Sequence, residues 1–219
     1  MNMIHNLPWL FLVLPLLVAA IDWVCLHKRP CLAATLSLLS AAGTFGLCVA
    51  YLLGSLPLGT PDIYTWMPCS IEQLCLHLGL VLDPLAMRMM LVVTGIGFLV
   101  HLFSLGYMKG DPSNLSRYFA GLSIFMFSMS TIVLADNLAM TFIGWEMVGF
   151  SSYLLIGHWF HKDSAADAAK KAFITNRVGD FGFLIGILLT MAVFGTLTFS
   201  EMGAATAGIP AAVLTATVL

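Results

Sequence analysis

Glu146 stands inside a run of uncharged residues, from Leu138 to His158, that is long enough to cross a lipid bilayer. Ten positions separate it from Asp136 and twelve from His158. In a helix that rises about 1.5 Å per residue, its carboxylate would lie roughly 15 Å from either end, near the membrane midplane. A charge at that depth costs at least about 2.5 kcal/mol and usually marks an ion or proton pathway. Glu146 is therefore the first candidate functional residue.

Two further charges stand in the next apolar segment. Arg177 and Asp180 are three positions apart, so they share one face of a helix and could pair within it. Counted from Lys171 at about 1.5 Å per residue, Asp180 would lie roughly 13 Å deep and Arg177 roughly 9 Å. Burial favours a protonated carboxyl group, whereas a nearby cation favours the carboxylate. An arginine that exchanged between Asp180 and Glu146 would switch Glu146 between retaining and releasing a proton, so these three residues are predicted to form a proton relay and its gate.

The same residues also have a purely structural interpretation. Arg177 and Asp180 would then form a static pair that pins their helix, while Glu146 bonds to Ser151, Ser152 or a backbone carbonyl. The two histidines His101 and His158 stand nearer the ends of their apolar segments, where an interfacial or packing role is expected. Glycines recur through the fifth and sixth segments and predict close backbone approach between helices. They are Gly144, Gly149, Gly179, Gly182 and Gly186.

The composition identifies an integral membrane protein. Hydrophobic residues make up 60% of the chain and charged residues 9%, with a mean hydropathy of +0.97, whereas a soluble domain has roughly 25% charged residues. The segments are almost wholly apolar, which favours helices over the alternating pattern of a β-barrel. We expect an all-α bundle with six full spans and the start of a seventh near Met202. The uncharged stretches are Leu7 to Ile21, Cys31 to Leu56, Leu91 to Leu105, Tyr118 to Ala135, Leu138 to Trp159 and Phe181 to Thr198.

The positive charges predict the orientation of this bundle. Seven of the nine basic residues fall on one side of a six-span arrangement, and only Arg88 and Arg177 stand inside or beside spans. Because basic loops stay in the cytoplasm, the N-terminus should face away from it. This bias favours a multi-pass protein of the bacterial plasma membrane, with an organellar inner membrane as the alternative. The seven are Lys28, Arg29, Lys109, Arg117, Lys162, Lys170 and Lys171.

The connecting segments carry several local signals. Residues 57–82 form the only sizeable polar insertion, predicted to be an extracytoplasmic hairpin or cap in which Cys69 and Cys75 could form a disulfide. Asp83 and Pro84 are predicted to begin the third helix, and Asp136 to cap the fifth. The polar stretch from His161 to Lys171 could lie on the cytoplasmic surface before the sixth helix begins.

The chain contains no Gly-rich phosphate loop, paired metal ligands or nucleophile–base motif, and its cysteines have no iron–sulfur spacing. We therefore expect no cofactor and no metal site here. Lipid and protons are the expected partners, and nucleic acid is not.

Several runs that include the charged residues resemble subunit 5 (bacterial subunit L) of respiratory complex I. They are Leu134-Ala135-Asp136-Asn137-Leu138, Gly144-Trp145-Glu146, Ser152-Tyr153-Leu154-Leu155-Ile156-Gly157, Lys171-Ala172-Phe173 and Asn176-Arg177-Val178-Gly179-Asp180. Shorter runs extend the resemblance over most of the chain, with only residues 1–80 weakly matched. These are His101 with Tyr107-Met108, Arg117-Tyr118-Phe119, and Phe194-Gly195-Thr196-Leu197 with Phe199.

The resemblance implies an antiporter-like, proton-translocating subunit of NADH–quinone oxidoreductase that works with other membrane subunits. Glu146 would match the family's mid-membrane glutamate, and Arg177 and Asp180 its gating pair. The family's redox cofactors lie in other subunits, so whether this chain counts as an enzyme is left open. Residues 1–116 would be the N-terminal helices and residues 117–219 the first part of the antiporter-like repeat.

The end of the chain departs from the family pattern. The family continues into a seventh helix that bears a lysine partner for the glutamate, and then into an inverted repeat, whereas this sequence stops at Leu219. A fragment is therefore expected. Two alternatives remain: a cation/proton antiporter or inorganic-carbon uptake subunit, which share Gly-Trp-Glu, and a membrane scaffold that translocates nothing.

Overall fold

The chain folds into a bundle of long helices in a computed structural model that describes residues 6–56, 64–67, 76–111 and 114–205. Within these residues, six helices are long and apolar enough to cross a membrane. They are α1 (Leu10–Val24, preceded by the 3₁₀ turn η1, Leu7–Trp9), α2 (Pro30–Leu52), α3 (Pro84–Tyr107), α4 (Leu115–Leu134), α5 (Leu138–Ile156, followed by the 3₁₀ turn η2, Gly157–Trp159) and α6 (Asp163–Phe194). The expected all-α fold with six spans is confirmed.

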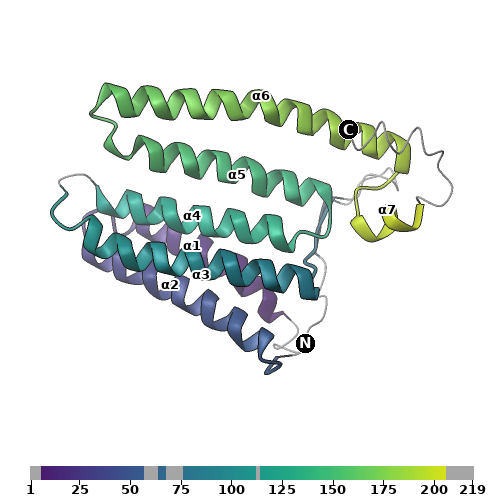
Figure 1. Ribbon diagram of the computed structural model, residues 1–219, viewed down its shortest axis with the longest axis horizontal. Coiled ribbons are helices and arrows are strands. Elements are labelled where there is room, and N and C mark those ends of the chain that lie inside the picture. Colours follow the sequence, from purple (N-terminus) through teal and green to yellow (C-terminus); the bar gives the residue numbers. More distant parts are fainter. Residues whose placement is uncertain (1–5, 57–63, 68–75, 112–113, 206–219) are drawn as a thin grey trace.

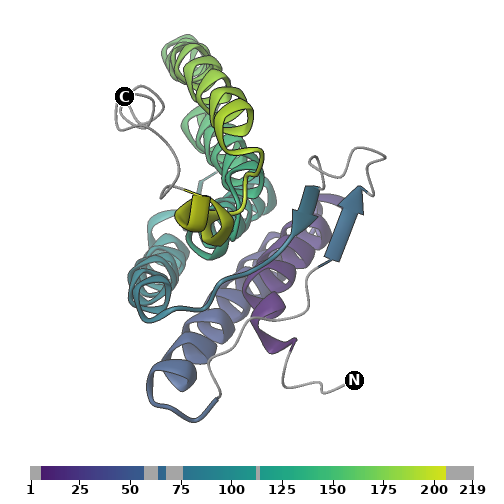
Figure 2. The same ribbon diagram turned by 90° about the vertical axis from the view of Figure 1, so that its right-hand side faces the viewer.

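The helices form two unequal groups. Figures 1 and 2 show α1 to α4 packed together, while α5 and α6 extend from this group as an antiparallel pair. α4 packs against α1, α2, α3 and α5, whereas α6 packs chiefly against α5 and η2. A short helix, α7 (Phe199–Ala205), begins where the seventh segment was expected. Contacts between α5 and α6 are therefore made at the edge of the molecule.

The turn between α4 and α5 lies at one end of the bundle, where backbone hydrogen bonds connect it to two other segments. On one side the backbone of Val81 donates to Leu134, at 2.9 Å. On the other side Leu138 donates to Leu197 at 3.0 Å, and Phe199 donates to the carbonyl of Asp136 at 3.1 Å. The α4–α5 turn is thus held by the segment before α3 and by the segment after α6.

A small hairpin covers this end, as the polar insertion predicted. Strands β1 (Tyr64–Met67) and β2 (Leu76–Leu78) pair antiparallel with one irregularity in register. The suggested Cys69–Cys75 disulfide lies outside the described residues. Beneath the hairpin is the main apolar cluster, which is the largest contribution to the core. Its fully buried large side chains include Phe11, Leu80, Met87, Met90 and Leu134.

One of the two predicted helix caps is confirmed. Asp83 caps α3, where its side chain accepts a hydrogen bond from the Ala86 amide at 2.5 Å. The cap of α5 is Asn137, which accepts from the Met140 amide at 2.8 Å, so the assignment of this role to Asp136 was wrong. Asp136 lies one residue too early and instead accepts a hydrogen bond from His77 Nε2 at 3.1 Å.

The sixth helix also corrects an expectation. α6 runs without a break for 32 residues from Asp163, so most of the polar stretch before Lys171 belongs to this helix. The alanines of this stretch favour helix, and residues 161–171 contain neither glycine nor proline that would end one. At about 1.5 Å per residue, α6 is roughly 48 Å long, which exceeds the hydrocarbon core of about 30 Å. The helix is therefore longer than a membrane span requires.

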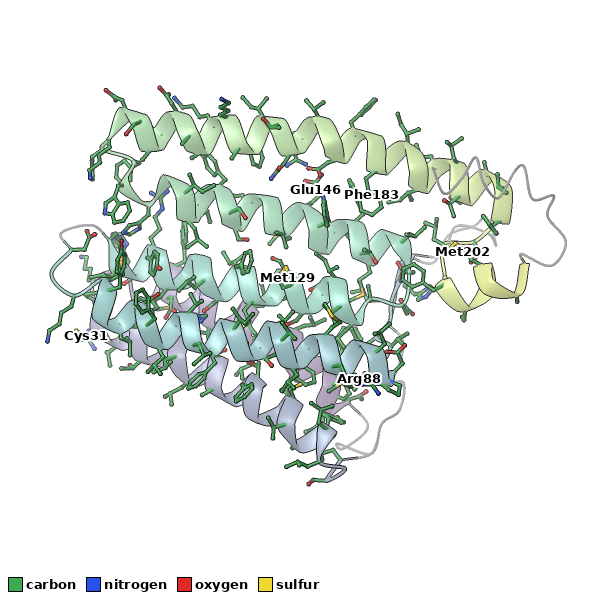
Figure 3. The ribbon with its side chains drawn as sticks, viewed as in Figure 1. Cys31, Arg88, Met129, Glu146, Phe183 and Met202 are labelled. Atoms are coloured by element: carbon green, nitrogen blue, oxygen red, sulfur yellow. The ribbon has the colours of Figure 1, made fainter. Side chains whose placement is uncertain are left out.

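The basic residues gather as the sequence predicted. All seven lie at the end formed by the α1–α2, α3–α4 and α5–α6 connections, on the left of Figure 1. Arg88, labelled in Figure 3, lies at the opposite end. The side of the membrane on which each end lies stays a prediction.

The glycines of α5 and α6 differ in what surrounds them. A Cβ added at Gly144 would come within 3.1 Å of the Ile132 nitrogen and 3.2 Å of the Ser128 carbonyl oxygen, so close approach of α5 to α4 is confirmed there. Around the other four, an added Cβ meets no described residue within 4 Å, so this part of the chain shows no close approach there. These are Gly149, Gly179, Gly182 and Gly186.

Candidate functional site

The register of α5 against α6 is set by aromatic side chains at several levels. Tyr153 contacts Phe173 near the basic end, with ring centroids 5.4 Å apart. Towards the other end Phe183 contacts Phe142 at 5.6 Å and Trp145 at 6.1 Å. Because the helices are antiparallel, residues whose numbers sum to about 325 lie opposite each other. This register brings position 146 level with positions 177 to 180.

Glu146 forms an ion pair with Arg177 across this interface. Arg177 Nη1 donates to Glu146 Oε2, and the guanidinium also lies over the Phe173 ring, 4.8 Å from its centroid. The Glu146 side chain is 23% exposed and that of Arg177 48%. Figure 3 shows Glu146 and Phe183 between the two helices. Glu146 is the ninth of the 19 residues of α5, so the pair lies near the middle of the span.

Asp180 has a different partner. Its carboxylate is only 6% exposed and accepts a hydrogen bond of 2.8 Å from the indole Nε1 of Trp145. The intrahelical pair of Arg177 with Asp180, expected from their spacing, is not formed. Shared helix faces make that pair possible, but the α5–α6 register offers Arg177 the carboxylate of Glu146 instead. Ser151, suggested as a partner for Glu146, donates to the carbonyl of Val148 at 3.0 Å.

The site therefore holds two carboxylates and one guanidinium, with one carboxylate bound to the cation and the other to a neutral donor. Asp180 is one helical turn from Arg177 on the same helix. Both residues thus lie on the same face of α6, opposite Trp145 and Glu146 of α5. Each carboxylate has a hydrogen-bond donor, as buried polar groups require.

Sequence reasoning missed two polar residues that the structure brings into view. Trp145 belongs to the Gly144-Trp145-Glu146 run, and an indole N–H inside a membrane span needs an acceptor. The first predicted stretch ends at Ile21, one residue before Asp22, whose side chain is fully buried in α1. The signal in the sequence that could have identified Asp22 was a single carboxylate at the end of an apolar segment.

Both histidines are buried within the bundle, in agreement with the expected packing role. His101 is 2% exposed and its Nδ1 donates to the Gly97 carbonyl at 2.7 Å. His158 is 4% exposed, and its ring packs edge-on against Tyr118 at 5.1 Å. Among the described residues, no three His, Cys, Asp or Glu side chains lie close enough together to hold a metal ion.

Comparison with known families gives two matches along the chain. Residues 66–119 match the N-terminal region of chain 5 of NADH–ubiquinone oxidoreductase (complex I). Residues 135–218 match the transmembrane region shared by NADH:quinone oxidoreductase and the Mrp antiporter. The second match contains Glu146, Arg177 and Asp180.

Individual relatives agree with these matches. NADH-quinone oxidoreductase subunit L of Mycobacterium tuberculosis is 42% identical over 95% of this chain and 33% of its own length. The chloroplastic NAD(P)H-quinone oxidoreductase subunit 5 of Zygnema circumcarinatum is 38% identical over 91% of this chain and 29% of its own length. The chain thus spans about a third of the length of these curated relatives.

A solved structure has the same arrangement of helices. The Mrp complex from Dietzia contains a chain that superposes with a TM-score of 0.75 and 27% identity, over 96% of this chain and 23% of that one. The family matches, the relatives and the six-span fold agree. This chain belongs to the antiporter-like family of complex I subunit L (chain 5) and corresponds to its N-terminal region.

Proposed function

We propose that this chain is part of a proton-translocating membrane subunit of NADH–quinone oxidoreductase, in which Glu146 carries the proton and Arg177 and Asp180 form the gate. The observation that carries the proposal is the ion pair between Glu146 and Arg177 at the middle of α5, with Asp180 one turn from the arginine. Ionisable groups at such a depth are costly, and a pathway is the usual reason for them.

The relay has two states that differ in the partner of Arg177. In the first, Arg177 pairs with Glu146, which is ionised, and Trp145 holds Asp180. In the second, Arg177 turns to Asp180 and leaves Glu146 without a cation in an apolar span, where it binds a proton from water. The return of Arg177 releases that proton. Translocation requires that the proton enters from one side of the membrane and leaves towards the other.

Energy for the exchange comes from outside this chain. Quinone reduction by NADH in other subunits would drive the movement of Arg177, and neighbouring membrane subunits of complex I are the partners. The basic end of the bundle would face the cytoplasm, or the equivalent compartment of an organelle. A bacterial plasma membrane is the proposed location.

A second candidate function is cation/proton antiport without NADH. The likeness to the Mrp complex favours it, since the matching fold and identity cover 96% of this chain. The same exchange of Arg177 would then be driven by a cation gradient. The inorganic-carbon uptake alternative has no comparable observation in its favour.

The test is proton pumping in inverted membrane vesicles that carry the complete subunit in its complex. Glu146→Gln keeps the size of the side chain but cannot release a proton, so it should abolish quinone-dependent acidification at matched assembly and NADH oxidation. Asp167→Asn is the control because it neutralises an exposed carboxylate of α6 that pairs with Lys170 at 3.5 Å. This control should pump like the wild type.

The outcomes separate the candidate functions. Unchanged pumping in Glu146→Gln would contradict the relay and leave the charges as packing residues of a scaffold. A sodium-dependent pH gradient that forms without NADH, and that Glu146→Gln removes, would assign the chain to the antiporter function.

A further inference from the structure

Asp22 is a buried carboxylate that the relay does not use. It is the only charged residue of α1, and its side chain is fully buried. Neither of its carboxyl oxygens has a hydrogen-bond partner among the described residues. Because an unpaired buried carboxylate is costly, native structures almost always hydrate such a group or protonate it.

Asp22 faces a cavity at the basic end of the bundle. The cavity has a volume of 120 Å³ and is also lined by Trp23, His27, Asn114 and Arg117. Within the described part of the chain, the Nε of Arg117 is likewise buried without a hydrogen-bond partner. The carboxylate and the guanidinium form no direct salt bridge within 4.0 Å. An unsatisfied carboxylate and a guanidinium with one unsatisfied nitrogen thus line the same small space.

Contacts between α1 and α4 hold the walls of this cavity. The hydroxyl of Ser116 donates to the Leu26 carbonyl at 2.7 Å and ties the start of α4 to the end of α1. Asn114 donates from Nδ2 to His27 Nδ1 at 2.7 Å, while its Oδ1 accepts from the Arg117 amide. The Arg117 guanidinium is also held over the Phe160 ring, 5.3 Å from its centroid.

The lining chemistry suits water and protons better than a metal ion. Water needs several polar partners and room, and the cavity offers the Asp22 carboxylate and the Arg117 Nε in a space larger than one water requires. A metal cation would find one carboxylate and would be repelled by Arg117, while the Asn114 oxygen is already engaged as a cap. The other helix packed on α1, α2, carries no Asp, Glu, Lys, Arg or His.

The cavity has a route to the basic surface. His27 is exposed and lines both this cavity and an adjoining hollow of 470 Å³ that is also bordered by Lys28 and Arg29. The distance from the relay is large, because α1 lies on the far side of α4 from α6 (Figures 1 and 2). Protons that reach Asp22 through this route need not pass Glu146.

We propose that Asp22 and Arg117 form a hydrated proton-binding site that opens on the basic end of the bundle and is separate from the Glu146 relay. Ordered water bridges the carboxyl group to the guanidinium. Asp22 takes a proton from this water and returns it to the same water, so its occupancy follows the pH on the basic side. Arg117 and His27 are the titratable or charged groups that face it, and Arg117 favours the ionised carboxylate.

The test is carbodiimide labelling of the complete subunit in its complex, because carbodiimides react with protonated carboxyl groups. Mass spectrometry of the peptide that contains Asp22 measures its labelling across a pH series, with Asp22→Asn to assign the site. Labelling should rise as the pH falls, and in Arg117→Gln the same labelling should be reached at a higher pH, because the ionised form has lost its cation. Arg117→Lys should stay near the wild type, and Glu146→Gln should not alter the profile.

Three results would overturn the proposal. Labelling that does not change with pH would mean a permanently protonated carboxyl group. No labelling at any pH, while the exposed carboxylate of Asp83 reacts, would mean a closed and dry site. Suppression by sodium, at constant pH and with choline as the replacement cation, would mean a metal-binding site. If Asp22→Asn fails to assemble, labelling of the wild type and of Arg117→Lys can still give each of these three results.

Discussion

At the scale of residues, the central feature is the choice of partner for Arg177. Glu146 pairs with it, and the carboxylate of Asp180 lies one helical turn away. Glu146 and Asp180 differ in what stabilises their charge, since one has a cation and the other an indole N–H. The proposed relay requires that Arg177 can pair with either carboxylate. Its residues can therefore be tested one at a time.

The first prediction concerns the coupling of Glu146 to Arg177. Arg177→Gln should abolish pumping because Glu146 then has no cation to displace its proton. In a double-mutant cycle with Glu146→Gln, the two residues should show a coupling of about 0.5–3 kcal/mol in the free energy of unfolding. Thermal unfolding of the four proteins in detergent measures it. Additive effects would show that the two side chains do not pair in the folded protein.

The second prediction concerns the support of Asp180. Trp145→Phe keeps a ring against Phe183 but removes the indole donor, which leaves a buried carboxylate oxygen unsatisfied at a cost of about 1–3 kcal/mol. Trp159→Phe is the control, because it removes the same kind of hydrogen bond from Asp111, and this bond is exposed so that water can replace it, whereas Asp180 is buried. Thermal unfolding should show a smaller loss for the control. Equal losses would contradict a special role for Trp145.

At the scale of elements, the interfaces of α5 are unlike each other. Towards α4 the helices approach closely at Gly144, whereas towards α6 the contacts are made by aromatic rings and the charged site. The α5–α6 interface is therefore the one whose side chains can rearrange without backbone contact. α4 instead provides the rigid support on which α5 is fixed.

The third prediction tests this difference with two alanines in one helix. Gly144→Ala would force its Cβ against Ile132 and the α4 backbone, and overpacking of this kind costs about 1–3 kcal/mol. Gly149→Ala has open space and should be neutral or stabilise the helix by up to about 1 kcal/mol. Unfolding midpoints of the two variants provide the measurement. A tolerated Gly144→Ala would show that α4 and α5 are farther apart than described.

At the scale of the whole molecule, the two ends of the bundle differ in charge. One end carries seven basic residues, and the other carries the hairpin, Arg88 and the turn at Asp136. The Asp22 cavity opens at the basic end. The orientation therefore decides from which compartment Asp22 would receive protons.

The fourth prediction is that the basic end faces the cytoplasm. Cys31 is exposed beside Lys28 and Arg29, so as the sole cysteine it should react with a membrane-impermeant maleimide only from the cytoplasmic side. Ser200→Cys, in the exposed part of α7 at the opposite end, should react only from the other side. Labelling of whole cells and of inverted vesicles distinguishes the two. The reverse pattern would invert the proposed orientation and the direction of translocation with it.

The sequence by itself determined the membrane class, the six spans, the basic end and the Asp83 cap, and it singled out the three charged residues of the proposed relay. These features depend on hydropathy, helix length and spacing, which are local properties of the chain. Resemblance of the runs around Glu146 and Arg177 identified the family, which the matches over residues 66–119 and 135–218 confirmed.

Only the tertiary structure decided which groups meet. It assigned Glu146 to Arg177 and Trp145 to Asp180, made Asn137 the cap of α5, and placed Asp22 and Arg117 in the lining of one cavity. Each of these contacts depends on the register and rotation of one element against another, and dense packing of many side chains sets both. Spacing along a single helix can show which residues share a face, but it carries no information about what lies opposite that face.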